Sequence, residues 1–383
     1  MTNLTKQILP GQVIGIIGGG QLGQMMTLAA KSMGFKVIVL DPQVDCPAGQ
    51  VADDQIVAAY DDENQIIELA KRSDVVTYEF ENVDATTIEK AQQLTQIPQG
   101  TKALRIAQDR VLEKQFLATE KLPHAAFKVV TSISELTKAV AEIGLPCLLK
   151  TARGGYDGKG QLVLRRASDI EAARALLDFG VCVLEEMVTF DQEISVMISQ
   201  NWAGQQALFP VIENQHRHNI LHISICPARV PAAVAQEAKE IAQKIATEIE
   251  LVGTLGVEFF VTPTGQLFVN EIAPRPHNSG HLTIEACDLS QFMAHIRGVC
   301  NWPLQTPRLW QSAVMVNVLG QDVPGALAKS CQSTDWSYHD YGKAERKENR
   351  KMGHITLLTD DLNKTLSEIE ATQIWALPKE QTK

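Results

Sequence analysis

The sequence has no cysteine arrangement that points to a metal site or a disulfide framework. Its seven cysteines are scattered over 383 residues, and none belongs to a C-x-x-C pair. An odd, dispersed set of cysteines is typical of reduced thiols in a cytosolic protein. The sequence also lacks an apolar run of membrane-spanning length, and residues 1–12 lack the basic-then-apolar pattern of a signal peptide. We therefore expect a soluble, cytoplasmic protein.

An excess of basic residues is absent as well. The chain carries 35 Lys and Arg against 45 Asp and Glu, a net charge of −10, which argues against a non-specific nucleic-acid binder. There is no internal repeat, low-complexity tract or long linker. A hydrophobic fraction of 45% and a charged fraction of 21% are those of an ordinary globular protein. The length is sufficient for two or three domains.

The N-terminal part of the sequence alternates between strand-like and helix-like segments. Apolar runs at 13–17, 36–40 and 75–78 alternate with helical patterns near 22–33 and 62–72. This order predicts a Rossmann-like parallel sheet with helices on its faces.

A glycine loop follows the first of these strands. Gly18–Gly23 satisfies G-x-G-x-x-G, and Asp41 lies about where a ribose-binding acid would lie. Taken alone, the loop favours a nicotinamide-dependent oxidoreductase, but a mononucleotide phosphate or a tight strand-to-helix turn also satisfies it. Ligands of open parallel sheets bind beyond the carboxyl ends of the strands, so we expect Glu79 and Asn82 to face a ligand at this loop.

The rest of the sequence mixes strands and helices in pairs, which predicts an α+β architecture. Helical patterns cover 100–122, 168–178 and 231–250. The expected strands lie near 126–130, 146–151, 161–165, 181–186, 192–199, 206–212, 313–319 and 354–359. We expect three domains, at 1–105, 106–303 and 304–383, with a lid at about 125–190.

Four glycines and two cations share one loop between two expected strands. Residues 153–161 read Arg-Gly-Gly-Tyr-Asp-Gly-Lys-Gly-Gln, which departs from the P-loop pattern G-x-x-x-x-G-K-[ST]. Such a loop suits a mobile lid that closes over phosphates and excludes water. Lys150, at the end of the preceding strand, is a cation of the kind that reaches a phosphate, with a structural lysine as the alternative.

Two glutamates are expected to face each other on a hairpin near residue 264. Residues 256–261 and 266–272 are strand-like, and Thr-Pro-Thr-Gly joins them. A hairpin centred on Thr264–Gly265 pairs Phe260 with Val269 and Glu258 with Glu271. Like charges opposite each other are destabilising unless a cation lies between them, and Mg²⁺ is typically held by one or two carboxylates plus substrate phosphates. A solvated edge hairpin with two exposed glutamates is the alternative.

Several motifs occur in the order of one known superfamily, ATP-grasp. They are Lys150, the loop 153–161, Glu185–Val188, Glu193, Glu258 and Asn270–Glu271. Within it, G-G-G-Q-L-G, E-F-E-N-V, G-G-Y-D-G-K-G-Q and N-E-I-A-P-R-P-H-N-S-G-H resemble the N5-carboxyaminoimidazole ribonucleotide synthetases of purine biosynthesis. The resemblance covers nearly the whole chain, except the first dozen residues and 360–383. It implies a pre-ATP-grasp domain (1–105), an ATP-grasp domain (106–303) and a small β-rich C-terminal domain (304–383).

The resemblance implies an ATP site with Mg²⁺. The residues it assigns to ATP are Arg110, Lys150, Gly155, Tyr156, Asp157, Gly158, Lys159, Gly160, Gln161, Glu185, Glu186, Met187, Val188, Glu193, His216, Asn270 and Glu271. Glu185–Val188 would meet the adenine and Glu193 the ribose. Glu258, Glu271 and Asn270 would hold Mg²⁺. Strand alternation puts Asn270 and Glu271 on opposite faces, so both reach the ion only if the strand twists or ends there, and Pro274 favours an early end.

The second substrate, aminoimidazole ribonucleotide, is expected where the N-terminal domain meets the lid. Its implied contacts are Gly20, Gln21, Leu22, Glu79, Asn82, Tyr156, His277, Asn278, Lys343 and Arg350. The residues implied in catalysis are Asp157, Lys159, Arg275 and Lys343. Without the resemblance, residues 343–351 would be interpreted as a solvated charged turn.

The implied reaction converts bicarbonate and ATP to carboxyphosphate, which releases CO₂ for attack by the amine of the nucleotide. Phosphoryl transfer needs positioning and charge neutralisation, which Mg²⁺, Lys150 and Lys159 would supply. We expect Arg275 to hold bicarbonate and Asp157 to orient the amine, whose proton passes to Asp157 or phosphate. The resemblance also implies a homodimer and a transient transfer of the product to the mutase that follows.

Three other functions are alternatives to this carboxylation. A related ATP-grasp ligase, such as a formate-dependent glycinamide ribonucleotide transformylase, shares the lid and the acidic pair but fits 156–160 and 274–281 less well. An oxidoreductase rests on the glycine loop and Asp41 alone. A non-catalytic nucleotide-sensing module would not need an intact carboxylate pair.

Overall fold

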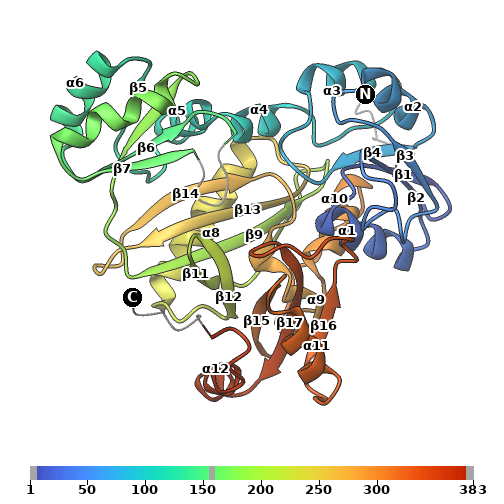
Figure 1. Cartoon of the computed structure of the whole chain (residues 1–383). Coiled ribbons are helices and arrows are strands. Elements are labelled where there is room, and N and C mark those ends of the chain that lie inside the picture. Colours follow the sequence, from blue (N-terminus) through green and yellow to red (C-terminus); the bar gives the residue numbers. More distant parts are fainter. Residues whose placement is uncertain (1–6, 155–159, 377–383) are drawn as a thin grey trace.

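The structure is a computed structural model, and it describes residues 7–154 and 160–376. The N-terminal parallel sheet lies to one side of a large central sheet, and a small lid lies on the other side, above the sheet (Figure 1). The C-terminal segment lies below the N-terminal region and continues the central sheet.

The N-terminal region is a four-stranded parallel sheet with the strand order β3-β2-β1-β4, as its alternating pattern predicts. Its elements are β1 (Val13–Ile17), α1 (Gln21–Ser32), β2 (Lys36–Asp41), β3 (Asp54–Val57), α2 (Glu63–Lys71), β4 (Val75–Tyr78) and α3 (Ala85–Ala91). The short β3 was not expected from the sequence. The apolar side chains of β1 and β2 are buried, and α1 packs against α10 (Gln291–Val299) of the central region. This contact fixes the glycine loop relative to the central sheet.

The lid is a four-stranded antiparallel sheet with the order β5-β8-β6-β7. Its elements are β5 (Phe127–Val130), α6 (Ile133–Ile143), β6 (Cys147–Thr151), β7 (Gln161–Leu164), η1 (Ala167–Ala173), α7 (Arg174–Leu177) and β8 (Cys182–Glu186). The expected helix at 168–178 is therefore a 3₁₀ segment followed by one helical turn. The glycine-rich loop connects β6 to β7, and these two strands pair with each other.

The central sheet contains nine strands in the order β14-β13-β9-β11-β12-β15-β17-β16, with β10 on β9. They are β9 (Gln192–Gln200), β10 (Gln206–Leu208), β11 (Ile212–Arg217), β12 (Ile220–Cys226), β13 (Gly253–Val261), β14 (Leu267–Ala273), β15 (Ser312–Leu319), β16 (Ser337–Asp340) and β17 (Lys351–Thr359). The single strand expected at 206–212 was wrong, because β10 ends at Leu208 and β11 begins a hairpin with β12. β15 pairs with β12, so the C-terminal strands extend this sheet.

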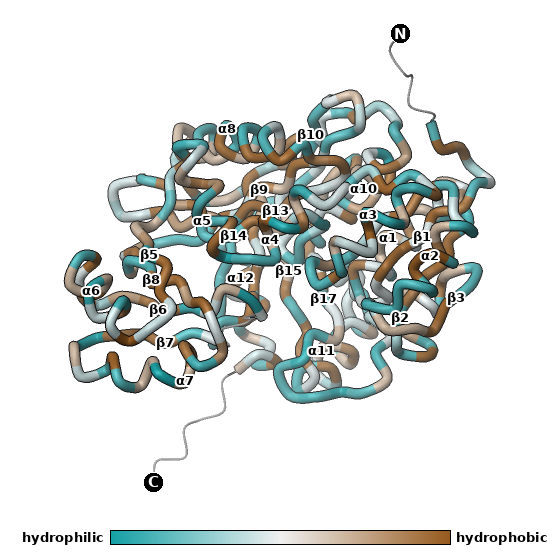
Figure 2. Tube along the Cα trace, turned by 90° about the horizontal axis from the view of Figure 1, so that it is seen from above, coloured by the Kyte–Doolittle hydropathy of each residue, from teal (hydrophilic) through white to brown (hydrophobic). Residues whose placement is uncertain are grey.

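Helices cover this sheet and link it to the lid. They are α4 (Lys102–Gln108), α5 (Arg110–Thr119), α8 (Ala232–Glu248), η2 (Asn278–Gly280), α9 (Thr283–Ala286), α10, α11 (Val323–Ser330) and α12 (Leu362–Ala371). The continuous helix expected at 100–122 was wrong, because Asp109 is extended and its carboxylate caps α5 by accepting from Val111 N–H. In Figure 2 the strands are largely hydrophobic, whereas helices such as α8 alternate between hydrophobic and hydrophilic residues. No helix in the described ranges is long and apolar enough to cross a membrane.

Candidate active site

Three cations surround one buried carboxylate where the lid meets α5. Glu185, on β8, lies 3.1 Å from Lys150 Nζ, 3.4 Å from Lys114 Nζ and 3.9 Å from Arg110 Nε. Burial alone would raise the pKa of Glu185, but the ammonium groups of Lys114 and Lys150 and the Arg110 guanidinium lower it. One carboxylate cannot neutralise three cations, so the cluster keeps a positive charge that suits a phosphate chain.

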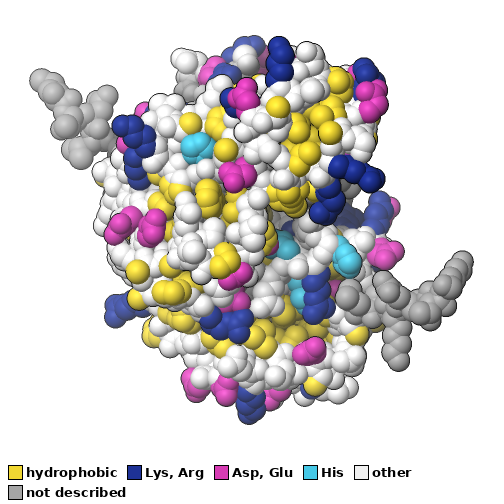
Figure 3. All heavy atoms as spheres, turned by 90° about the vertical axis from the view of Figure 1, so that its left-hand side faces the viewer, with side chains coloured by type: hydrophobic (Ala, Val, Ile, Leu, Met, Phe, Trp, Pro, Cys, Tyr) yellow, Lys and Arg dark blue, Asp and Glu magenta, His cyan; other side chains and the backbone are white. Residues whose placement is uncertain are grey.

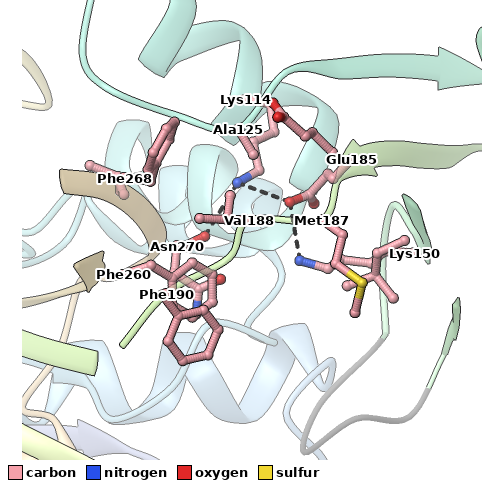
Figure 4. Close-up of a pocket in the computed structure, with 13 residues that line it drawn as sticks. Lys114, Ala125, Lys150, Glu185, Met187, Val188, Phe190, Phe260, Phe268 and Asn270 are labelled. Carbon is pink, nitrogen blue, oxygen red and sulfur yellow. Dashed lines mark hydrogen bonds and ion pairs between the residues drawn. The ribbon is translucent and has the colours of Figure 1, made fainter. Parts of the chain in front are cut away.

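A cavity of about 120 Å³ opens beside this cluster (Figure 4). Its walls include the connector after β8, from Glu186 to Val188, and the Asn270 side chain. Phe190 and Phe260 also line it and stack on each other with ring centroids 4.3 Å apart. An apolar cavity with a few convergent polar groups is typical of a small-molecule site, and this one has the flat aromatic and backbone surroundings that suit a purine ring.

Glu193 lies on β9, and His216 lies on the neighbouring strand β11 of the central sheet. His216 Nδ1 is 3.0 Å from Glu193 Oε2. Burial would lower the pKa of His216, but the hydrogen bond to Glu193 raises it. The pair places a carboxylate and an imidazole at the side of the site formed by β9 and β11.

Glu258 and Glu271 face each other across β13 and β14, as the sequence predicts, but the predicted register fails between this pair and the turn. Phe260 pairs with Phe268 and Phe259 with Val269, so the pairing of Phe260 with Val269 was wrong. The register shifts by one residue between Glu258 and Phe259. Asn270 is therefore the extra residue of a β-bulge.

This bulge changes the faces on which Asn270 and Glu271 lie. An unbroken strand in the register of Phe260–Phe268 would place Asn270 opposite Glu258 and Glu271 opposite the buried Val257. The bulge brings Glu271 opposite Glu258 instead, while Asn270 lines the cavity. β14 continues to Ala273, directly before Pro274, so the strand does not end early at Asn270–Glu271 as Pro274 had favoured.

The facing carboxylates of Glu258 and Glu271 repel each other, and a bound cation would relieve this repulsion. Burial, together with the neighbouring Glu271, raises the pKa of Glu258 to about 7. No group of three or more His, Cys, Asp or Glu suited to a metal occurs within residues 7–154 and 160–376. The oxygen donors of Glu258, Glu271 and Asn270 thus fit a hard cation that completes its coordination with phosphate and water, as Mg²⁺ does.

The glycine loop is filled by a side chain of the protein itself. Glu79 accepts hydrogen bonds from Gly20 N–H, at 2.6 Å, and from Gly23 N–H. A Cβ added to Gly18 would lie 2.3 Å from the Glu79 side chain. The glycines therefore admit a carboxylate to the N-terminus of α1.

Asp41 is also occupied by internal contacts. Its carboxylate accepts from Gly19 N–H at 2.7 Å and from the Tyr60 hydroxyl at 2.6 Å. Because Glu79 and Asp41 hold the positions that a dinucleotide pyrophosphate and ribose would need, the oxidoreductase reading of this loop does not hold.

Several predicted substrate residues converge on Glu79 from other parts of the chain. Arg275, 2.8 Å from Glu81, and Lys343 both lie close enough to Glu79 to influence a pKa there. Burial, followed by repulsion from Arg350, lowers the pKa of Lys343 to about 8, and its Nζ donates to the Lys351 carbonyl at 2.8 Å. In Figure 3, histidine and basic side chains gather in the middle of the face below the lid.

The loop after β14 brings His277 and Asn278 to the same region. His277 Nε2 lies 3.4 Å from Glu258 Oε1. Asn278 has both side-chain amide atoms buried without a hydrogen-bond partner among the described residues. Such an unsatisfied amide is costly, which suits a group that receives a ligand.

The remaining predicted residues divide into three groups. Gly20, Gln21 and Leu22 form the start of α1, Gly160 precedes β7, and Gln161 is the first residue of β7. Asn82 lies elsewhere, in a hollow of about 770 Å³ that Arg105 and Arg153 also line, and Arg350 donates to the Glu345 carbonyl. Gly155, Tyr156, Asp157, Gly158 and Lys159 lie outside the described residues.

Sequence reasoning missed Glu113 and Lys114 on α5 and the aromatic pair Phe190–Phe260. A signal for Lys114 was present, because Arg110 and Lys114 are four residues apart and therefore share one face of a helix. No local signal marks the aromatic pair, since Phe190 lies in the segment between β8 and β9, Phe260 lies on β13, and the two meet only in the folded chain.

Family comparisons divide the chain in the same order as the fold. A ribonucleotide synthetase preATP-grasp domain matches residues 12–108, and an ATP-grasp domain matches residues 115–292. The phosphoribosylaminoimidazole carboxylase C-terminal domain matches residues 313–368.

Relatives match over almost the full length. The N5-carboxyaminoimidazole ribonucleotide synthase of Bacillus subtilis is 47% identical over 367 residues, covering 96% of this chain and 97% of that protein. The crystal structure of an N5-carboxyaminoimidazole ribonucleotide synthetase in complex with ADP is 48% identical, with a TM-score of 0.94 over 97% of this chain and 99% of the other. The Aspergillus clavatus synthase in complex with ADP and 5-aminoimidazole ribonucleotide is 30% identical, with a TM-score of 0.89 over 95% and 98%.

Proposed function

Since this chain belongs to the N5-carboxyaminoimidazole ribonucleotide synthases of the ATP-grasp superfamily, we propose how its own residues carry out the reaction of that family. The protein is an ATP-dependent ligase that carboxylates 5-aminoimidazole ribonucleotide in purine biosynthesis. The assignment of individual residues, of Mg²⁺ and of the intermediate is our proposal.

One observation carries this proposal: the cationic cluster around Glu185 and the carboxylate pair Glu258–Glu271 are joined by one helix. Lys114 on α5 contacts both Glu185 and the backbone of Asn270 (Figure 4). Cations and carboxylates held at a fixed separation suit a nucleotide whose phosphates lie between them, with the metal on the carboxylate side.

We assign ATP to the cavity between the lid and β14. Phe190, Phe260 and the connector 186–188 would enclose the adenine, and Glu193 with His216 would bind the ribose. Arg110, Lys114 and Lys150 would hold the phosphates, with residues 155–161 closing above them. In addition to the expected adenine contact, we assign to the Glu185 carboxylate the ordering of these three cations, which lie within 3.1 to 3.9 Å of it.

We assign Mg²⁺ to Glu258, Glu271 and Asn270. When bound, the ion would neutralise charge that develops on the transferred phosphoryl group. The two glutamates repel each other without a cation, so their arrangement favours binding of Mg²⁺ together with ATP.

We assign 5-aminoimidazole ribonucleotide and bicarbonate to the space between Glu79, Arg275, Lys343 and the loop 277–278. Arg275 and Lys343 would hold anions, which suits a ribose phosphate and bicarbonate. Transfer of phosphate to bicarbonate gives carboxyphosphate, whose breakdown to CO₂ beside the amine leads to N-carboxylation. The proton of the amine would pass to the released phosphate or to Asp157, and Lys159 would assist transfer.

Four further assignments rest on the family and on composition. We propose a homodimer, which sedimentation measurements test, and a transient transfer of the product to the next mutase, which coupled-enzyme trapping tests. The seven cysteines are free, which supports a reducing, cytoplasmic location that fractionation would check. The domains 1–105, 106–303 and 304–383 remain a proposal, supported by the order of the family matches.

The test measures phosphate release from Mg·ATP in bicarbonate buffer, with and without 5-aminoimidazole ribonucleotide. Strong stimulation by this nucleotide is expected, together with formation of an N-carboxylated product. Glycinamide ribonucleotide with formate serves as the control for the related transformylase reaction. Stimulation by the control alone would assign the chain to that reaction instead.

A further inference from the structure

The outer edge of β14 is covered by α5 instead of by another strand. β14 is the terminal strand of the nine-stranded sheet, so its outward backbone groups need other partners. Val269 N–H donates to the Pro123 carbonyl at 2.8 Å. The next outward groups, the Asn270 carbonyl and Ile272 N–H, bond to side chains.

Two consecutive residues of α5 supply these side chains. Lys114 Nζ donates to the Asn270 carbonyl at 3.3 Å, and Ile272 N–H donates to Glu113 Oε1 at 2.9 Å. The side chains are nearly inaccessible, with Glu113 5% and Lys114 1% exposed. Charged residues are rarely buried to this extent without a specific partner. Lys114 has a second partner in Glu185, whereas Glu113 bonds to the strand.

The two contacts lie on either side of the bulge. The outward N–H groups of β14 belong to Val269 and Ile272, three residues apart instead of two, which reflects the extra residue Asn270. A strand with a bulge competes with the unbroken register, in which Glu271 would turn away from Glu258. Ile272 N–H points outward, toward the acceptor Glu113, only in the bulged register.

We propose that Glu113 and Lys114 are positioning residues that replace the missing neighbouring strand and hold the Asn270–Glu271 bulge in place. Through the bulge they direct Glu271 toward Glu258, and through Lys114 they tie this strand to the cationic cluster at Glu185. The expected effect on the Mg²⁺ requirement rests on the proposed Mg²⁺ site. The expected effect on the backbone of β14 does not depend on that site.

The test separates the length of the Glu113 side chain from its charge. Glu113→Gln keeps the reach and the acceptor oxygen, Glu113→Asp keeps the charge but is one methylene shorter, and Glu113→Ala removes both. Hydrogen exchange of residues 268–275, measured by mass spectrometry without nucleotide, is expected to be roughly tenfold faster in the Asp and Ala variants. The Gln variant is expected to exchange like the wild type.

A second measurement follows the Mg²⁺ concentration that gives half-maximal ATP turnover. We expect it to rise roughly tenfold in the Asp and Ala variants, with a smaller change in the KM for 5-aminoimidazole ribonucleotide, because only the carboxylate pair is displaced. Gln115→Ala, at an exposed position of α5, is the matched control and is expected to match the wild type in both measurements.

The opposite ranking would overturn the proposal. If Glu113→Asp behaves like the wild type and Glu113→Gln behaves like Glu113→Ala, Glu113 acts through its charge. If all three variants match the wild type, Glu113 does not hold the bulge in place. Should the Ala variant fail to fold, the comparison of Gln with Asp still decides. Glu271→Gln tests the metal site separately: an unchanged Mg²⁺ requirement there would remove the proposed metal site, while the exchange data would still test the positioning of the strand.

Discussion

The carboxylate of Glu79 binds the backbone at the first turn of α1. It accepts from two backbone N–H groups that have no partner within the helix, and burial raises its pKa although these hydrogen bonds oppose the rise. The glycines at 18, 20 and 23 leave the space that it fills. The glycine loop and Glu79 therefore support each other within the fold.

Glu79→Gln is expected to lower the free energy of unfolding by about 1–3 kcal/mol, because an amide NH₂ cannot accept from the second backbone N–H. Urea unfolding followed by circular dichroism measures the change. Glu68→Gln, at an exposed position of the neighbouring α2, is the control and is expected to change little. Equal stability of both variants would mean that the two hydrogen bonds do not support the helix.

At the level of secondary-structure elements, α10 joins the N-terminal sheet to the central sheet through one buried histidine. Thr254 N–H, on β13, donates to His295 Nδ1 at 3.1 Å, so the ring carries its proton on Nε2. Nε2 lies 2.8 Å from the Thr77 hydroxyl on β4, which donates to Gln99. Burial lowers the pKa of His295 to about 3.

This contact predicts a pH dependence. The unfolded chain binds a proton at His295 below pH 6.5, whereas the folded chain does so only near pH 3, so folding loses stability as the pH falls through this window. Between pH 7.5 and 5.0 the wild type is expected to lose about 2 kcal/mol relative to His295→Gln. Urea unfolding at both values measures the difference, and His218→Gln, at an exposed site, is the control. A pH-independent difference between wild type and His295→Gln would contradict the expectation.

At the level of the whole molecule, the central sheet connects the nucleotide site to the C-terminal cations. β12 pairs with β15, and β15 pairs with β17, which begins at Lys351. Lys343, from the same C-terminal segment, lies close enough to Glu79 for that carboxylate to raise the lysine's pKa against the effect of burial. The proposed site therefore draws on segments that are far apart in the sequence and that belong to three different sheets.

A fragment that ends at residue 303 is expected to self-associate and to lose cooperative unfolding. Removing 304–383 leaves β12 as an unpaired edge and exposes the apolar side chains of Ile223 and Ile225. Size-exclusion chromatography and thermal unfolding measure the effect, with a chain that ends at residue 376 as the control. A monomeric 1–303 fragment with a sharp transition would show that the C-terminal strands are dispensable for folding.

The sequence by itself determined the features that depend on local chemistry. Alternation of apolar segments predicts the parallel N-terminal sheet, and the motifs from Lys150 to Asn270–Glu271 identify the superfamily. These properties require only neighbours along the chain. The opposition of Glu258 and Glu271 was predicted as well, but the pairing next to the turn differs by one residue, so this opposition depends on the bulge at Asn270.

Only the tertiary structure decided which groups meet across long distances in the sequence. It placed Glu79 in the glycine loop, which a local pattern had assigned to a ligand phosphate. It also placed Glu113 and Lys114 beside the bulge of β14, where no spacing in the sequence could indicate a contact. The physical reason is that buried polar groups must find partners, and those partners are chosen by how helices and sheets pack.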